Sequence, residues 1–534
     1  MRKPLKNLSK KLTRGQIDRR DFMMSAIAMG LTVSAATTIA DKAQAATPKK
    51  GGRFRQGLTG GATSDSLDPA SFLDSYMINV GMGQLRNCLT EIGPDNKLRP
   101  ELAESWEASP DAATWTFKIR EGVEFHNGKT LDANDVVASI QHHIGPDSKS
   151  GAKGILQDIT EIKADGKNTV VMTLSTGSAD FPFLLSDYHT GICPANDDGT
   201  MDWQSGVGTG GYVLESFDPG IRTMTKRNPN YWKEGTAHFD EIETLLIADT
   251  TARTNSLMTG DIDGMQNVDL STVDLVKRNP NVNVFSTTGN QHATLPMFTN
   301  TAPFDNNDVR LALKYSMDRQ EWLEKILQGY GALGNDIPLG PANQYRATTD
   351  EIPQRDYDPD KAKFHLKKAG LDSLTVDLSA SNTAFAGAID AAVLFAERAK
   401  VAGININVVR EPDDGYWSNV WMKKPWMVSY WGGRPTEDWM FSQVYRAGAD
   451  WNETFWEHER FNKLLIEGKV ELDPAKRREI YVEMQRIVHD EGGALIPLLM
   501  SYTQAVSIKI GLPDQIASNW GFDGEKSAER WWFA

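Results

Sequence analysis

The sequence predicts an α/β protein built from several structural units, with mixed sheets wrapped by helices. Its 534 residues correspond to roughly three domains of average size. Hydrophobic residues make up 40% of the chain and charged residues 24%, which is typical of a globular protein with a sizeable core. From about residue 286 onward, strand patterns alternate with helix patterns, and this order favours a mostly parallel, helix-covered sheet.

The first half of the chain shows clear local patterns. Strict apolar alternation over residues 114–119 predicts a half-buried strand, and Asp132 is placed to cap a helix that starts at residue 133. We also expect strands at 53–58, 170–174 and 242–247, a hairpin over 212–217 and 222–225, and helices at 76–89 and 251–258.

In the second half, apolar spacing predicts one long amphipathic helix over residues 307–327. Further helices are expected at 360–369, 386–402 and 477–489, and strands at 294–298, 375–379, 404–409 and 494–499. Trp531, Trp532 and Phe533 are too apolar for a free tail, so we expect the C-terminus to pack against the protein.

The first 45 residues have the pattern of an export signal. Basic residues run from Arg2 to Arg20, an apolar stretch follows over 22–40, and residues 43–45 form a small-x-small cleavage pattern. The pair Arg19 and Arg20 resembles a twin-arginine signal; an ordinary secretory signal and, less favoured, a membrane anchor are the alternatives. Because the first cysteine is Cys88, no lipid anchor is expected, and the mature protein should be soluble in the periplasm.

Charge and cysteine content exclude some partners. The net charge is −14 and the first 45 residues contribute +6, so the remainder carries −20, which argues against nucleic acid or anionic membrane as a partner. The two cysteines, Cys88 and Cys193, leave open either a disulfide or two buried thiols. Neither lies in a CxxC motif, so a zinc or redox site is not expected.

No residue pattern indicates catalysis, a metal or a cofactor. Residues 206–211 match GxGxxG, but a strand is predicted directly after them, so we interpret them as a glycine turn. Lipase-like, zinc-protease and P-loop motifs are absent from the sequence, and the one adjacent histidine pair, His142 and His143, would not share a helix face. We therefore predict a protein that is not an enzyme and holds neither metal nor cofactor.

Aromatic residues are concentrated between residues 416 and 456. They are Tyr416, Trp417, Trp421, Trp426, Tyr430, Trp431, Trp439, Tyr445, Trp451 and Trp456. We expect half or more of them to pack in a core and the others to line a ligand cleft, because Trp and Tyr combine a large flat surface with a polar group. Gly432, Gly433 and Pro435 break regular structure beside Trp431, which predicts a binding loop there.

Several blocks of sequence are similar to the family-5 extracellular solute-binding proteins, the dipeptide- and oligopeptide-binding components of ABC transporters. The blocks are residues 102–106, 114–120, 122–128, 135–136, 208–212, 227–232, 303–310 and 358–362. They occur in the family's order and cover nearly the whole mature chain. The resemblance implies a monomeric binding protein that delivers a small ligand to an ABC permease and ATPase.

The resemblance also implies a periplasmic-binding-protein clamshell of two lobes with an extra third domain. After the signal peptide (1–45), lobe I would comprise residues 46–85, 201–285 and 501–534, the extra small domain residues 86–200, and lobe II residues 286–500. A ligand would lie between the lobes and drive closure of a hinge.

In this family, the aspartate of a Gly-Trp-x-Gly-Asp loop pairs with the ligand's α-amine. The matching stretch here is Tyr430, Trp431, Gly432, Gly433 and Arg434, so an arginine stands where the aspartate is expected. A guanidinium attracts carboxylate or phosphate and repels an amine, which predicts an anionic or zwitterionic ligand. The predicted ligand-binding site also includes Tyr76, Asp438 and Trp439.

Alternatives remain open at this point. One alternative is that Arg434 is a surface residue at the cleft rim. Another is that the loop is shifted and that Glu437 and Asp438 restore amine binding. Short peptides, opine-like compounds and amino-acid conjugates are all compatible ligands. A secreted hydrolase is a competing function, and a ligand sensor or chaperone on the same fold is another.

Overall fold

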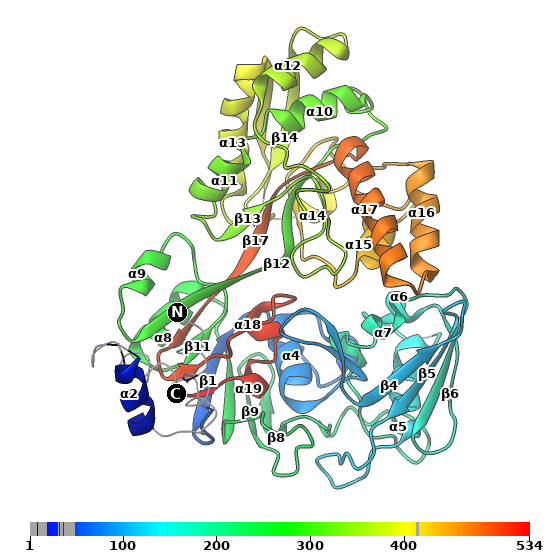
Figure 1. Ribbon diagram of the computed structural model, residues 1–534, viewed down its shortest axis with the longest axis vertical. Helices are drawn as coiled ribbons and strands as arrows, with labels where there is room; N and C mark the ends of the chain where they lie inside the picture. The colour runs from blue at the N-terminus through cyan, green and yellow to red at the C-terminus, as the bar shows by residue number, and fades with distance from the viewer. Residues whose placement is uncertain are drawn as a thin grey trace.

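Two bodies joined by a pair of long strands make up the computed structural model (Figure 1). The structure describes residues 48–534 except 147 and 413–415, together with residues 8, 19–29, 31 and 36. The predicted signal cleavage site at 43–45 lies outside these residues; within the signal region, helix α2 spans Arg19–Ala28. Among the described residues, no helix is both long and apolar enough to cross a bilayer.

The lower body of Figure 1, which we define as the described residues 48–288 and 501–534, is built on one end of a nine-stranded sheet. Its strands lie in the order β11-β1-β10-β9-β8. The elements are β1 (Arg53–Leu58), α4 (Ser75–Val80), β8 (Tyr212–Asp218), β9 (Arg222–Arg227), β10 (Glu241–Leu246), α8 (Thr250–Thr259), β11 (Gly264–Met265), α9 (Val273–Lys277), β18 (Ile510–Gly511), α18 (Gly521–Gly524), α19 (Ser527–Arg530) and β19 (Trp532–Phe533). Trp531 and Trp532 are buried, as the sequence predicted.

Inserted into the lower body is a small domain around a separate four-stranded sheet, β4-β5-β7-β6. Its elements are β2 (Thr90–Ile92), β3 (Leu98–Pro100), β4 (Ala103–Ala108), β5 (Thr114–Ile119), α5 (Ala133–Ile144), α6 (Lys153–Leu156), β6 (Ile159–Ala164), β7 (Thr169–Leu174), α7 (Phe181–Leu184) and the 3₁₀ turn η3 (Tyr188–Thr190). Asp132 caps α5 in a reciprocal capping box with Asp135, which confirms the predicted helix start. The domain has its own hydrophobic core.

The upper body, residues 289–500, contains two hydrophobic cores of its own. Its elements are α10 (Asn307–Tyr315), α11 (Arg319–Lys325), β13 (Gly331–Leu333), α12 (Pro359–Lys368), β14 (Leu374–Ala380), α13 (Ala388–Ala399), β15 (Ile404–Arg410), α14 (Tyr416–Asn419), β16 (Ser429–Trp431), α15 (Glu437–Val444), α16 (Glu459–Val470) and α17 (Pro474–Glu491). The predicted single helix over 307–327 is wrong, because Asp318 accepts a bond from the Glu321 amide and starts a second helix.

Strands β12 (Val282–Pro296) and β17 (Ala494–Ser507) connect the two bodies and pair antiparallel along their length (Figure 1). At its lower end β17 also pairs with β11, and at its upper end with β13. The register shifts between Thr288 and His292, where the strands pass from one body to the other. An irregular ladder at a two-strand crossing is a natural place for hinge motion.

The prediction of a mostly parallel sheet is wrong for the large sheet. Among the described strands, its parallel pairs are those of β1 with β10 and with β11. Strand β14 and strand β15, linked by α13, form a separate parallel pair and account for the strand–helix–strand pattern of the sequence. The glycine run 206–211 leads into β8 as predicted; a Cβ on Gly208 would lie 2.1 Å from the carbonyl oxygen of Leu85.

Candidate functional site

The predicted binding loop, residues 430–434, follows strand β16 at the crossing between the bodies. Ala293 of β12 pairs with Tyr430, and His292 pairs with Trp431. The chain then turns at Gly433, which has a φ of 79° and whose Cβ would lie 2.4 Å from the Asn290 Cβ, so a larger residue would not fit. The side-chain amide of Asn290 donates to the carbonyl oxygen of Arg434 at 3.0 Å and fixes the end of the loop.

Arg434 is held by neutral groups. Its guanidinium lies over the rings of Trp431 and Trp439, 5.4 and 5.8 Å from their centroids. Nε donates to Gln443 Oε1 at 2.6 Å, and Nη1 donates to the Gly433 carbonyl at 2.7 Å. Burial lowers the pKa of Arg434, while Tyr188 and Asp187 oppose this effect. Within the described part of the chain, no carboxylate forms an ion pair with this guanidinium.

The lower body presents an aromatic pair toward Arg434. The ring of Tyr188, in η3 of the small domain, lies tilted against that of His189, with centroids 4.1 Å apart, and meets Trp520 edge-on at 5.9 Å. Burial raises the pKa of Tyr188, and the charge of Arg434 acts in the opposite direction. The Tyr188 hydroxyl has no hydrogen-bond partner among the described residues, so it is free to bond to a ligand. No local sequence pattern had singled out Tyr188 or Trp520.

Ring contacts link five of the clustered aromatic side chains of the upper body, and three of the five are partly exposed. Ring centroids are 5.8 Å apart for Trp417 and Tyr430, 6.3 Å for Trp417 and Trp421, 6.4 Å for Trp421 and Trp431, and 5.8 Å for Trp431 and Trp451. Trp417, Tyr430 and Trp451 remain about 40% exposed, at 40%, 38% and 43%. Exposed aromatic surface of this kind marks a ligand- or partner-binding region.

A buried carboxylate fixes two of these indoles. Glu453 accepts the Trp421 Nε1 hydrogen at 2.6 Å and the Trp431 Nε1 hydrogen at 3.0 Å. Burial raises the pKa of Glu453 to about 7, while the hydrogen bonds from the two indoles and from Ser429 act against this. Both rings are thereby held in a set orientation, which is the preorganisation a binding surface needs. Glu453 was not predicted from the sequence.

The ten aromatic residues of the 416–456 cluster divide, as expected, between core and surface. Tyr416, Trp426, Tyr445 and Trp456 are buried, and Trp431 is 7% exposed, so half of the ten pack in the interior.

Two predicted site residues lie away from the loop. Tyr76 is buried in α4, and its hydroxyl contacts Thr223 Oγ1 at 3.0 Å and the Thr244 carbonyl at 3.2 Å, both in the lower body. Asp438 is buried in the first turn of α15, where burial raises its pKa to about 6 and Asp180 acts in the same direction. The structure therefore brings Tyr430, Trp431, Gly432, Gly433, Arg434 and Trp439 together, but neither Tyr76 nor the side chain of Asp438.

The described residues contain no group of three or more His, Cys, Asp or Glu side chains that could hold a metal ion. Cys88 and Cys193 are free and buried. Burial raises the pKa of Cys88 to about 12 and that of Cys193 to about 11, so neither is a nucleophile near neutral pH. The groups that the loop presents are a guanidinium and aromatic rings.

A hollow of about 820 Å³ lies elsewhere, along α17. Its lining is mainly charged and includes Glu351, Arg478, Glu483 and Arg486. Lining of this kind is unlike that of a pocket for an organic ligand, which is mostly apolar with a few polar groups.

Comparison with known proteins agrees with the geometry. The model of the bacterial extracellular solute-binding proteins, family 5, matches residues 97–453. The dipeptide-binding protein of Escherichia coli strain K12 is 26% identical over 479 residues, which cover 81% of this chain and 86% of that protein. Heme-binding protein A of Haemophilus influenzae is 29% identical over 331 residues, or 57% of this chain and 60% of that protein.

A solved structure shares the fold. The periplasmic binding protein AgaA of A. tumefaciens R10, in complex with agropinic acid, superposes with a TM-score of 0.70 at 24% identity. The match covers 90% of this chain and 99% of AgaA.

Proposed function

The chain belongs to family 5 of the bacterial extracellular solute-binding proteins, and from this premise we propose that it captures a zwitterionic or anionic, peptide-like solute by its carboxylate. Homologues and structural neighbours are substrate-binding proteins of ABC importers, and this chain shares their fold. The remaining question is what this member binds.

The observation that carries the proposal is Arg434. A buried or half-buried arginine normally pairs with a carboxylate, because an unpaired charge is costly to desolvate. Arg434 instead rests between Trp431 and Trp439 and bonds to neutral oxygens only. A ligand carboxylate would supply the missing counter-charge in bidentate geometry.

The aromatic surface around Trp431 supports a ligand with an apolar or flat portion beside its acidic group. Short peptides, opine-like compounds and amino-acid conjugates combine both features. Dipeptide and agropinic acid, the ligands named for two similar proteins, belong to these classes. On the opposite side, Tyr188 and Trp520 would close over the ligand as the bodies rotate about β12 and β17.

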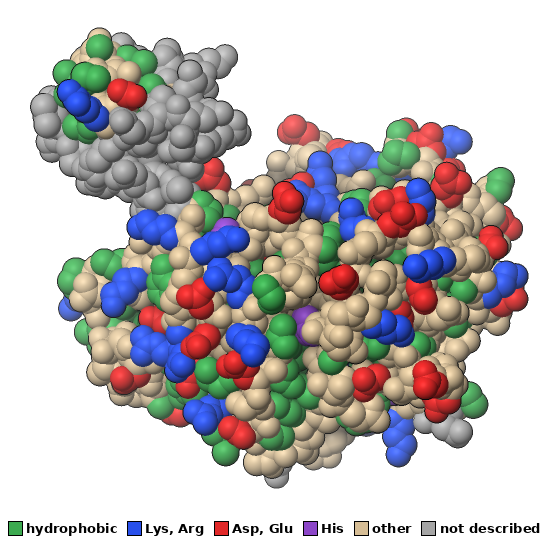
Figure 2. Space-filling model, turned by 90° about the horizontal axis from the view of Figure 1, so that it is seen from below, with side chains coloured by type: hydrophobic (Ala, Val, Ile, Leu, Met, Phe, Trp, Pro, Cys, Tyr) green, Lys and Arg blue, Asp and Glu red, His purple; other side chains and the backbone are tan. Residues whose placement is uncertain are grey.

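The cellular setting is also part of the proposal. We infer a signal peptide over residues 1–45, of twin-arginine type, release of a soluble monomer into the periplasm without a lipid anchor, and delivery of the ligand to an ABC permease and ATPase. The lobe boundaries predicted from the sequence remain predictions. On the face seen in Figure 2, Lys and Arg alternate with Asp and Glu, so no broad basic patch for nucleic acid is present on that side.

Native mass spectrometry of the protein purified without denaturation tests the proposal. We expect a bound small molecule that carries a carboxylate and is released chemically unchanged. Arg434→Met should lose it, whereas Arg446→Met, which removes an exposed arginine just beyond α15, should retain it. A ligand without any acidic group, or a bound reaction product, would contradict the proposal.

A further inference from the structure

The two bodies meet a second time, far from the strands that connect them. The upper body is one continuous stretch of chain joined to the lower body at β12 and β17, while α16 and α17 lie above α6 and α7 of the small domain (Figure 1). There the Ala179 amide donates to the Lys469 carbonyl at 2.8 Å, and Lys469 Nζ lies 3.1 Å from Asp158 Oδ2. A rotation of the bodies about the crossing strands must make or break these contacts.

At the centre of this contact, a buried ion pair joins Arg477 of the upper body to Asp180 of the small domain at 2.8 Å. Arg477 is held in place by its own body. Its guanidinium lies 5.4 and 5.3 Å from the ring centroids of Tyr345 and Tyr481, which stack on each other, and it donates to the Gly468 carbonyl. The cation is therefore positioned in advance, and closure of the bodies brings Asp180 to it.

Acidic side chains outnumber basic ones at this contact in the described part of the chain. Asp180 lies close enough to Glu437 and Asp438, in the first turn of α15, to act on the ionisation of both. Arg477 and Lys469 are the facing cations; Lys469 is also engaged by Asp158, and Tyr345 and Tyr481 are the other titratable neighbours. Asp180 Oδ2 is buried and has no hydrogen-bond partner in the described chain, so it can accept a bond from a protonated carboxyl.

We propose that this contact is a latch between the two bodies, and that the latch closes with uptake of a proton by Glu437 and Asp438. Three carboxylates, those of Asp180, Glu437 and Asp438, are gathered around Arg477, and a proton relieves their mutual repulsion. When the bodies separate, Asp180 moves away with the small domain and its charge no longer raises the pKa of either acid, so the open form binds the proton less tightly.

The sign of the pH dependence follows from linkage. Burial, with the charge of Asp180 acting in the same direction, raises the pKa of Glu437 to about 7 and that of Asp438 to about 6. The latched form thus binds more protons than the open form between about pH 5 and pH 8. Lowering the pH through this window favours the latch by up to about tenfold per pH unit for each proton taken up.

A distance measurement between the bodies tests the latch without any ligand, so its outcome is independent of the proposed function. Spin labels are placed on cysteines introduced at Lys167, in the small domain, and at Lys463, on α16; both positions are exposed. The native Cys88 and Cys193 are buried and should remain unlabelled. Pulsed electron–electron double resonance measures the distance between the two labels. We expect the population with the short distance to grow as the pH is lowered from 8 to 5.

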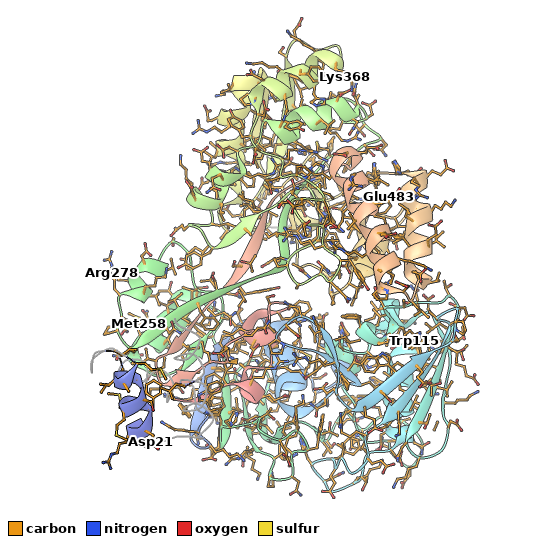
Figure 3. All side chains as sticks on the ribbon, viewed as in Figure 1. Asp21, Trp115, Met258, Arg278, Lys368 and Glu483 are labelled. Carbon is orange, nitrogen blue, oxygen red and sulfur yellow. The ribbon has the colours of Figure 1, made fainter. Side chains whose placement is uncertain are left out.

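The double variant Glu437→Gln and Asp438→Asn should remain latched at all of these pH values, because the repulsion is gone. Glu483→Gln is the matched control: this acid lies on α17, where it is 41% exposed and pairs with Arg460 (Figure 3). It should reproduce the parent profile. Asp180→Asn removes the ion pair and should favour the open form throughout. Circular dichroism checks that each variant is folded.

Two results would overturn the proposal. One is a distance distribution that does not change between pH 5 and pH 8 in the parent protein. The other is an unaltered pH response in the double variant, or in each single variant if the double variant does not fold.

Discussion

Two arginines of the upper body have opposite surroundings. Arg319 is buried, and its Nη2 lies 2.8 Å from each carboxylate oxygen of Asp336, which also accepts a bond from Arg355. Arg434 has neutral partners and two indole rings, with no carboxylate partner in the described part of the chain. The positive charge of Arg319 is neutralised within the fold, while that of Arg434 is the one we propose to meet a ligand carboxylate.

The surroundings of Asp336 show how strongly the buried cations near Arg319 interact with this carboxylate. Burial would raise the pKa of Asp336, but Arg319, Arg355 and Lys314 outweigh it and hold this pKa at about 2. Burial in turn lowers the pKa of Lys314 to about 7. Oδ1 of Asp336 accepts the Ile496 amide as well, so the network also anchors β17. Nothing in this cluster is available for a ligand.

The largest expected effect comes from the cluster around Asp336. Asp336→Asn leaves Arg319 buried without its counter-charge and Arg355 with only the more distant Asp490, 3.4 Å away, and should lower the free energy of unfolding by about 3–5 kcal/mol. Urea denaturation followed by circular dichroism measures the change. Asp360→Asn, in an exposed position on α12, is the control and should alter stability by less than about 0.5 kcal/mol. Equal stability of the two variants would contradict this account.

The second effect concerns Arg434. Arg434→Met should weaken ligand binding by about 2 kcal/mol, or roughly 30-fold, because a ligand carboxylate loses its partner. Stability should change little, since no carboxylate of the described chain depends on this guanidinium. Calorimetry with the ligand identified by mass spectrometry measures the affinity, with Arg446→Met as control. An unchanged dissociation constant would remove Arg434 from the site.

The same contrast explains what the sequence could predict. Local patterns located β5, α5 and the β8–β9 hairpin, because each has a regular apolar period or a capping residue. The crossing strands β12 and β17 were predicted much too short. Ser, Thr, Asn and Gln fill the middle of β12, polar residues interrupt the second half of β17, and the pairing partners are about two hundred residues apart, so no local pattern reveals the full strands.

The binding loop and the charge of its ligand were predicted from a short motif and its departure at Arg434, and both stay predictions. Tyr188, Trp520 and Glu453 were missed, because each stands in an ordinary loop sequence and gains its role only through tertiary contacts. Tyr76 was proposed as a ligand contact, and its hydroxyl is already bonded within the lower body.

Tyr188 and Tyr76 allow a second test of the difference between a ligand contact and a structural contact, with a smaller expected effect. Tyr188→Phe removes a hydroxyl without a partner in the described chain, so it should weaken ligand binding by about 1 kcal/mol and leave stability unchanged. Tyr76→Phe removes a hydroxyl bonded to Thr223 and to the Thr244 carbonyl, so it should lower stability by about 1 kcal/mol and leave affinity unchanged. Calorimetry and urea denaturation of both variants decide between them; a loss of affinity in Tyr76→Phe would restore Tyr76 to the site.

The smallest effect is spectroscopic and concerns Glu453, the acid beneath the aromatic surface. Burial holds its pKa at about 7, and its two oxygens bond to the indoles of Trp421 and Trp431. Tryptophan fluorescence should therefore change with a midpoint near pH 7 in the parent protein, and this component should be absent in Glu453→Gln.

Because the pKa of Glu453 in the folded protein lies above the usual value for a glutamate, the group's contribution to stability is present below about pH 4.5 and is lost as the pH rises to about 7. The parent should accordingly lose stability over this range relative to Glu453→Gln. The guanidinium of Arg434 lies over the ring of Trp431, so an anionic ligand bound to that guanidinium should shift the midpoint of the fluorescence change to higher pH. A ligand bound elsewhere would leave the midpoint unchanged.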